Sequence, residues 1–113
     1  MSHYAFIAPV KPGKVDAWRD RIQEMTTTRA AEMQASRERF GLEKEEVWLQ
    51  HTPMGDFAVV YLEAPDIDGV LTNMMTSQDP FDNWFRENVL VDVHGMDPSA
   101  APQPMNEVIL GPH

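Results

Sequence analysis

One hairpin limits how this chain can fold, because both of its faces are apolar. A turn is expected at Pro53-Met54-Gly55-Asp56, in the segment from Glu45 to Glu63. Pairing residue 52 with 57 then puts 51 opposite 58, 49 opposite 60 and 47 opposite 62. One face carries Val47, Leu49, His51, Ala58, Val60 and Leu62, and the other carries Trp48, Gln50, Thr52, Phe57, Val59 and Tyr61. Antiparallel sheets usually wet one face, so we expect helices over the aliphatic face and a second cover over the aromatic one.

The composition is that of one globular domain spanning 1–113. The chain is 42% apolar and 24% charged, which suits a single core. Its net charge of −9 argues against nucleic-acid and anionic-membrane partners, because these are bound by clustered Lys and Arg. The sequence has no Cys, no signal-peptide pattern at its start and no apolar run of membrane-spanning length. A cytoplasmic protein is therefore expected.

Hydrophobic spacing predicts the remaining elements. Alternation over 3–10 predicts a first strand, and three- and four-residue steps over 14–40 predict a helix that ends at Gly41. The residues of the run Thr26-Thr27-Thr28 have low helix propensity, so the sequence allows a bend or break there. A short helix follows Pro65-Asp66.

The last third of the chain carries clear helix signals. Asp79 is a suitable N-cap and Pro80 suits the first helical position. The helix that begins there is expected to end at Gly95. The apolar segment 105–110 is expected to form a final edge strand.

The predicted order is strand, helix, strand, strand, helix pair, strand. With right-handed crossovers, this order corresponds to an α+β fold: a ferredoxin-like βαββαβ sandwich whose four antiparallel strands are ordered 4-1-3-2. Tyr4 and Phe6 of the first strand are expected to join Trp48, Phe57 and Tyr61 on the uncovered face. An exposed aromatic surface predicts association, and a homodimer that closes sheet on sheet is the simplest cover.

With this element order and the phrase Gly55-Asp56-Phe57-Ala58-Val59-Val60-Tyr61-Leu62-Glu63, the chain resembles the dimeric α/β-barrel superfamily. That superfamily includes antibiotic-biosynthesis monooxygenases, small polyketide cyclases, muconolactone isomerases and stress-responsive barrel proteins. Lys11-Pro12-Gly13-Lys14 and Ser77-x-x-Pro80-x-Asp82 resemble an uncharacterised bacterial branch of it. The resemblance implies a dimer that forms an α/β barrel, and a pocket between the sheet and its own helices that is used mostly without a cofactor.

Two positions depart from the monooxygenase pattern of that superfamily. Its monooxygenase-type members usually have a Trp just after the third strand and a His on the following helix. Ala64 and, approximately, Asn73 stand at those places here. The departures weaken both the oxygenase and the haem-degradation interpretations.

Histidine is the natural acid–base group near neutral pH, and two of the four histidines occupy promising positions. His51 ends the second strand and His94 ends the last helix, so both are expected at the same end of the sheet. His51 is predicted as a catalytic base and His94 as an acid or orienting group. The alternatives are a half-buried strand-end His51 and a His94 that caps its helix through the dipole.

Large aromatic side chains supply candidate walls for a ligand pocket. Trp18 and Trp84 are predicted on the inner faces of their helices, where they either roof a substrate pocket or pack the core. A metal site is not expected, because the sequence has no His-x-His, no His-Glu-x-x-His and no Cys.

These features favour a cofactor-independent small-molecule enzyme, an isomerase or polyketide-type cyclase that uses histidine acid–base chemistry. The alternative is a non-catalytic dimeric ligand-binding or stress-associated protein. A cofactor-free monooxygenase is a third interpretation, which rests on the resemblance alone.

Overall fold

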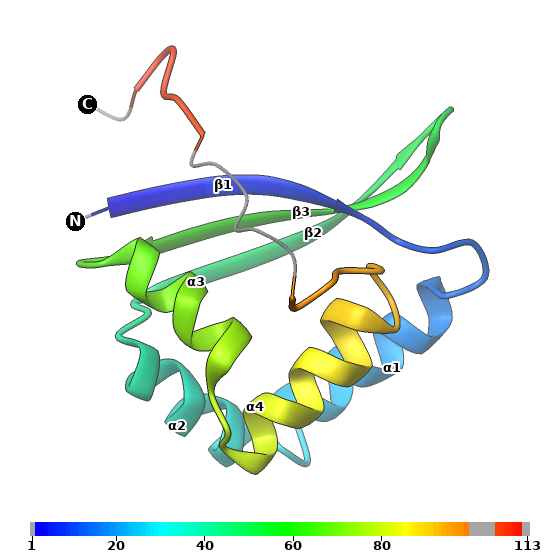
Figure 1. The fold of residues 1–113 in the computed structure, drawn as a ribbon. Helices are drawn as coiled ribbons and strands as arrows, with labels where there is room; N and C mark the ends of the chain where they lie inside the picture. The colour runs from blue at the N-terminus through cyan, green and yellow to red at the C-terminus, as the bar shows by residue number, and fades with distance from the viewer. Residues whose placement is uncertain (1, 100–105, 112–113) are drawn as a thin grey trace.

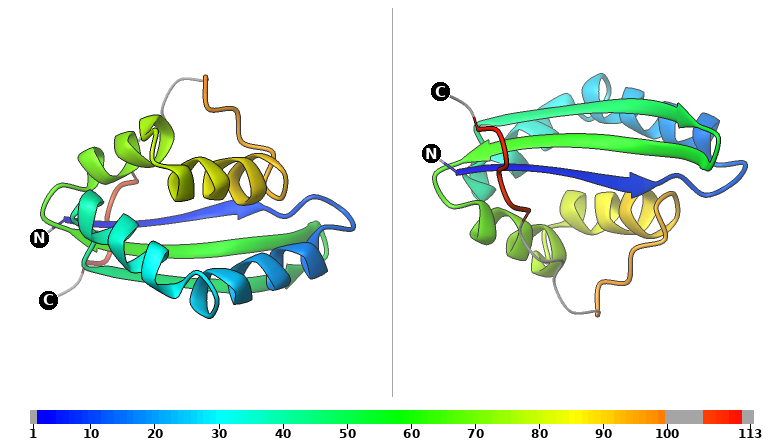
Figure 2. Two further views of the ribbon diagram at one scale, coloured as in Figure 1. Left: turned by 90° about the horizontal axis from the view of Figure 1, so that it is seen from below. Right: turned by 90° about the horizontal axis from the view of Figure 1, so that it is seen from above.

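The computed structural model describes residues 2–99 and 106–111, which form a three-stranded antiparallel sheet with helices on one face (Figure 1). The elements, in order, are β1 (Ser2–Pro9), α1 (Val15–Thr26), α2 (Ala30–Phe40), β2 (Lys44–Thr52), β3 (Gly55–Ala64), α3 (Ile67–Thr76), α4 (Pro80–Phe85) and the π-helical η1 (Arg86–Val91). The strand order is β1-β3-β2. Figure 2 shows α1 and α2 beneath the β2 side of the sheet, and α3 and α4 beneath the β1 side. The α+β class predicted from the sequence is confirmed.

The predicted fourth strand is wrong for the part of it that the structure describes. Residues 106–111 form neither strand nor helix, and they lie on the sheet face opposite the helices (Figure 1). The side chain of Asn106 donates a hydrogen bond to the carbonyl oxygen of Ala5 in β1. Pro104 and Pro112 flank this apolar run in the sequence, and proline lacks the N–H that a strand ladder needs. The sheet is therefore not the four-stranded ferredoxin-like sheet of order 4-1-3-2.

The hairpin turn is tighter than the sequence predicted. Thr52 pairs with Gly55, and Leu49 with Ala58, so only Pro53 and Met54 lie between the strands. Gly55 adopts a φ of 127°, which a glycine adopts without steric cost. The pairing is shifted by two residues from the prediction, and an even shift leaves every side chain on its predicted face.

The first strand faces the opposite way from the prediction. Tyr4 pairs with Leu62 and Phe6 with Val60, and directly paired residues point to the same face of a sheet. Tyr4 is buried in the core, and Phe6 packs against it. Both therefore face the helices, and the uncovered face receives Ala5 and Ile7 of β1 instead.

The single helix predicted over 14–40 is divided at its threonines, as the sequence allowed. α1 ends at Thr26 and α2 begins at Ala30. The hydroxyls of Thr26 and Thr27 donate hydrogen bonds to the carbonyl oxygens of Ile22 and Gln23. Threonine hydroxyls that take up these carbonyl groups weaken the helix locally, so the chain turns here.

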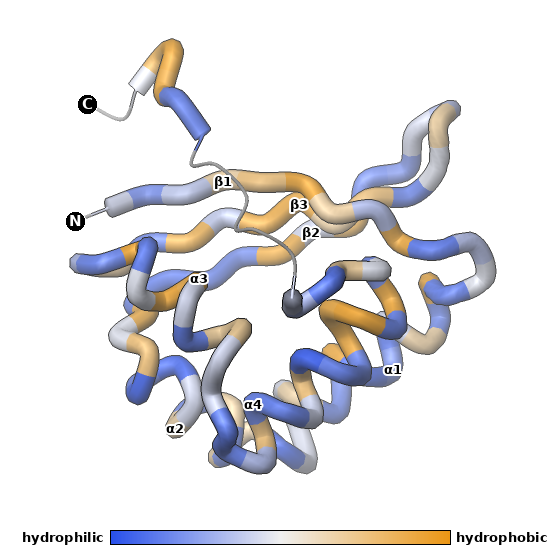
Figure 3. Tube along the Cα trace, in the orientation of Figure 1, coloured by the Kyte–Doolittle hydropathy of each residue, from blue (hydrophilic) through white to orange (hydrophobic). Residues whose placement is uncertain are grey.

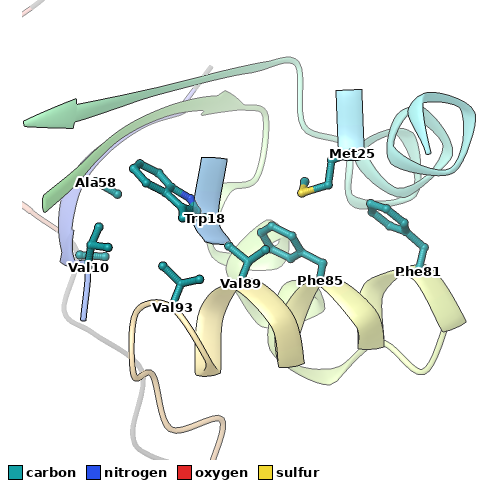
Figure 4. Close-up of a cluster of buried hydrophobic side chains, with 9 residues drawn as sticks. Val10, Trp18, Met25, Ala58, Phe81, Phe85, Val89 and Val93 are labelled. Carbon is teal, nitrogen blue, oxygen red and sulfur yellow. The ribbon is translucent and has the colours of Figure 1, made fainter. Parts of the chain in front are cut away.

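The hydrophobic core lies between the helices and the middle of the sheet. The trace is apolar through the centre of β1 and β3, over which the helices pack (Figure 3). In Figure 4, Trp18 of α1, Met25 at its end, and Phe85 and Val89 of the last helical segments point into the space between these layers. A second cluster packs Phe40 of α2 against Ile67 and Val70 of α3. The two helical halves of the chain, α1 with α2 and α3 with α4 and η1, therefore pack on each other through both clusters.

A buried carboxylate joins those two halves. Asp82 of α4 is 2% exposed and accepts hydrogen bonds from Ser36 (2.5 Å) and Arg39 (2.9 Å) of α2, and from Ser77 (2.6 Å). Burial raises the pKa of Asp82, but these hydrogen bonds outweigh burial and hold its pKa below the usual range. The side chain therefore stays charged and ties α2 to the start of α4.

We expect Asp82→Ala to lower the free energy of unfolding by about 3 kcal/mol, because it removes three hydrogen bonds to a charge and leaves the buried Ser36 hydroxyl without its acceptor. Asp79→Ala is the matched control. Asp79 caps α4 by accepting from the Phe81 N–H (3.0 Å), and the loss of a cap costs about 1 kcal/mol. Urea denaturation of both variants checks this, and equal losses would contradict it.

Candidate functional site

A cavity of about 260 Å³ lies between the sheet and the helices. Its volume is slightly below the roughly 300–1,000 Å³ that is usual for drug-sized ligands, so it suits a small molecule. Apolar side chains make up most of its walls. They include the aromatic residues Phe6, Trp18 and Phe85 and the methionines Met25, Met33, Met74 and Met96. Thioether side chains adapt to the shape of what they contact, so these walls can adjust to a ligand.

His94 is the acid–base group of the cavity wall. It is 8% exposed, and its ring meets the edge of Trp18, with the ring centroids 5.6 Å apart. Its Nδ1 lies 2.8 Å from the carbonyl oxygen of Pro9. A carbonyl oxygen only accepts, so Nδ1 donates and carries the proton of the neutral ring. Nε2 has no hydrogen-bond partner among the described residues and keeps its lone pair.

The chain before His94 holds this ring in position. The N–H of His94 donates to the Val89 carbonyl oxygen (3.2 Å), five residues back, which is the π-helical pattern. The preceding Asp92 accepts hydrogen bonds from Lys14 (3.1 Å) and Arg21 of the first helical region. The end of η1 is therefore attached to α1 and to the residue that precedes it.

The His94 side chain is neutral at physiological pH. Burial lowers its pKa below 6.5, and the hydrogen bond to Pro9 only partly opposes that effect. A neutral imidazole with a free Nε2 in an apolar cavity can accept a proton from a bound molecule.

His51 lies outside the cavity. Its register in β2 puts it on the helix side of the sheet, as predicted, but the helices do not cover this end of the hairpin. The side chain is 67% exposed, and its Nδ1 lies 2.6 Å from a carboxylate oxygen of Asp56. The two histidines predicted together are at the same end of the sheet, but only His94 reaches the cavity.

The two tryptophans also separate. Trp18 is buried in the cavity wall. Trp84 is half-buried away from the cavity, where its ring packs against Phe81. The guanidinium carbon of Arg29 lies over the same ring, 4.5 Å from its centroid. Its neighbour Phe85 takes the wall position that the sequence assigned to Trp84.

Sequence reasoning missed Glu45. This residue of β2 lines the cavity, and its two carboxylate oxygens accept from Nε and Nη2 of Arg37 at 2.9 and 3.1 Å. Arg37 is buried and stacks over Phe85, with its guanidinium carbon 4.6 Å from the ring centroid. No signal in the sequence pointed to the pair, because a Glu at the start of a strand is usually a solvated residue.

Over residues 2–99 and 106–111, the structure contains no cluster of three His, Asp or Glu side chains able to hold a metal ion. Within the same residues, no helix has the length and apolar character needed to cross a bilayer.

No family model matches the sequence, and no curated protein matches it. The resemblance to the dimeric α/β-barrel superfamily therefore stays a prediction, and the candidate site rests on its own geometry.

The lowered pKa of His94 predicts a pH-dependent stability. Below pH 6.5 the unfolded chain takes up a proton at His94 that the folded protein resists. Folding is therefore weakened as the pH falls from 6.5 towards the folded-state pKa. His94→Gln lacks this effect and keeps the other histidines. We expect the unfolding free energy of the wild type to fall relative to that of His94→Gln between about pH 7.5 and 5.5, measured by urea titration. A constant difference would contradict the prediction.

Proposed function

We propose that this protein is a cofactor-independent enzyme that moves a proton on a small, largely apolar carbonyl compound, as an isomerase or cyclase does. The observation that carries the proposal is the neutral imidazole of His94 in the wall of an apolar cavity, with Nδ1 held by Pro9 and Nε2 free. A cytoplasmic location, as the sequence predicts, belongs to the same proposal.

In this mechanism the free Nε2 of His94 takes a proton from a carbon next to the carbonyl group. The electrons of the broken C–H bond pass to the carbonyl oxygen, which becomes an enolate. Where the substrate has a β,γ double bond, the imidazolium returns its proton to the γ carbon and the double bond moves into conjugation, which completes an isomerisation. In a cyclase the enolate carbon attacks a second carbonyl carbon and closes a ring, and the imidazolium gives its proton to the oxygen of that second carbonyl. The Pro9 carbonyl oxygen fixes the tautomer and stabilises the positive ring that forms.

A non-catalytic ligand-binding protein is the second candidate. The apolar, methionine-rich walls favour binding as such, and this candidate requires no proton transfer by His94. The oxygenase interpretation gains no support from a described residue.

Hydrogen–deuterium exchange at the activated carbon of 2-tetralone tests the catalytic proposal without knowledge of the natural substrate. This bicyclic ketone is small and apolar, and proton NMR in D₂O follows the loss of its carbon-bound proton. We expect the wild type to accelerate the exchange, and His94→Gln to lower that acceleration about 100-fold or more, which is a typical contribution of a general base.

His51→Gln is the matched control, because His51 is exposed and lies outside the cavity. It is expected to exchange 2-tetralone at the wild-type rate. Equal rates for the wild type and His94→Gln would reject the catalytic proposal and leave the ligand-binding candidate.

We further propose that a second copy of this chain covers the part of the sheet face opposite the helices that residues 106–111 leave open. Its apolar surface includes Ile7 and Trp48, which are 65% and 51% exposed. Charged groups on this face lie at one end of it, where Lys44 lies 3.5 Å from Glu46 and 3.6 Å from Glu63 and offsets part of their negative charge. Two copies related by a two-fold axis can therefore bring the apolar part of this face together and leave the charged end at the rim. Phe57 and Tyr61 stay in the proposed interface, whereas Tyr4 and Phe6 face the helices.

We expect the wild type to sediment as a dimer at micromolar concentration, and Trp48→Glu to sediment as a monomer, because the variant buries a charge in the interface. Gln23→Glu adds the same charge on α1, which lies on the helical side of the molecule, and is expected to leave the dimer intact. A monomeric wild type would overturn this proposal.

A further inference from the structure

We infer that the cavity selects a neutral ligand with a hydrogen-bond donor, a phenol or an alcohol, whose hydroxyl binds Glu45, and that it rejects carboxylates. The inference rests on the proposed function in one respect: the same cavity is taken as the binding site. It adds the chemical class of the ligand and a specificity-determining residue.

Glu45 and His94 lie at opposite ends of the cavity. Glu45 pairs with Leu62, which in turn pairs with Tyr4 of β1. His94 is bound to Pro9, at the other end of β1. Pro9 follows Tyr4 by five positions, which is about 17 Å along a strand. A ligand in this cavity therefore has Glu45 towards one end, His94 towards the other and mostly apolar walls between them.

Arg37 leaves Glu45 able to bind a ligand. It donates one hydrogen bond to each carboxylate oxygen, and a carboxylate has about four acceptor positions. A further donor can therefore bind to Glu45. The Nη1 of Arg37 donates to Ser36 (3.1 Å), and Arg37 is not among the residues that line the cavity. The ion pair thus presents its acceptor side to the ligand and turns its cation away.

The charges of the cavity exclude an anion. Among the described residues that line it, none is Lys or Arg, and the charged one is Glu45. A bound carboxylate would lose its hydration without gaining a cation, and it would lie near another carboxylate. A hydroxyl that donates to Glu45 instead forms a charge-assisted hydrogen bond.

Three probes of one shape test the inference: 2-naphthol, naphthalene and 2-naphthoate. A hydrogen bond to a charged group contributes about 1.5–3 kcal/mol. We therefore expect 2-naphthol to bind the full chain about tenfold or more tighter than naphthalene, with 2-naphthoate weaker than both. Dissociation constants come from intrinsic tryptophan fluorescence and isothermal titration calorimetry. The inference is overturned if 2-naphthoate binds as tightly as 2-naphthol or more tightly. It is also overturned if none of the three probes binds.

Two variants locate the hydroxyl. Glu45→Gln removes the charge and keeps the side-chain shape, so the advantage of 2-naphthol over naphthalene is expected to fall to within about threefold. His51→Gln is the matched control, because His51 is exposed and lies outside the cavity, and it is expected to keep the full advantage. His94→Gln tests the other end of the cavity. Loss of the advantage in His94→Gln alone would place the hydroxyl at the wrong end and overturn the inference. If Glu45→Gln does not fold, the ranking of the probes on the wild type and on His94→Gln decides.

The inference and the proposed function fail separately. If 2-tetralone exchange requires His94 while 2-naphthoate binds as tightly as 2-naphthol, the catalytic proposal stands and the inference about the ligand falls. If the tighter binding of 2-naphthol requires Glu45 while the exchange of 2-tetralone does not depend on His94, the inferred ligand class stands and the catalytic proposal falls.

Discussion

The buried carboxylate of Asp82 is the constraint on which the helical layer depends. It joins α2 to the start of α4 through Ser36 and Arg39, and it holds the preceding loop through Ser77. In Figure 1, the start of α4 and the chain between α1 and α2 meet on the side of the helical layer away from the sheet. These bonds hold the helical layer together on the side away from the cavity, which lies between that layer and the sheet.

Hydrophobic periodicity was enough to predict most of the fold. It gave the three strands that form, the helices between them, the break at the threonines and the two faces of the hairpin. It failed where the structure depends on how one strand pairs with another. Alternation divides β1 into two sets of side chains, but only its pairing with β3 shows that Tyr4 and Phe6 face the helices. Residues 106–111 are apolar enough for a strand, and they do not pair as one.

Only part of the candidate site could be predicted from the sequence. His94 was identified from its chemistry and its place at a helix end. Its burial and its bond to Pro9 depend on the tertiary structure and could not be read from the sequence. Glu45 was missed because its partner Arg37 lies on a different element, and only their contact makes the carboxylate a feature of the interior. The result is a cavity with one carboxylate in its lining, within a chain of net charge −9. The negative charge of the whole chain also disfavours the approach of anions.

The π-helical turn of η1 sets the direction of the only histidine that reaches the cavity among the described residues. A hydrogen bond that spans five residues instead of four accommodates one more residue in the turn than an α-helix does. One residue corresponds to about 100° of rotation in an α-helix. The side chains after that turn, including that of His94, therefore point in a different direction about the helix axis than they would if α4 continued as a regular α-helix. A helix of regular α geometry could keep the same packing at Phe81 and Phe85 and still point the side chain at position 94 in another direction. The gain or loss of a single residue in this segment is therefore a route by which related chains can acquire or lose an acid–base group in the cavity while the core stays the same.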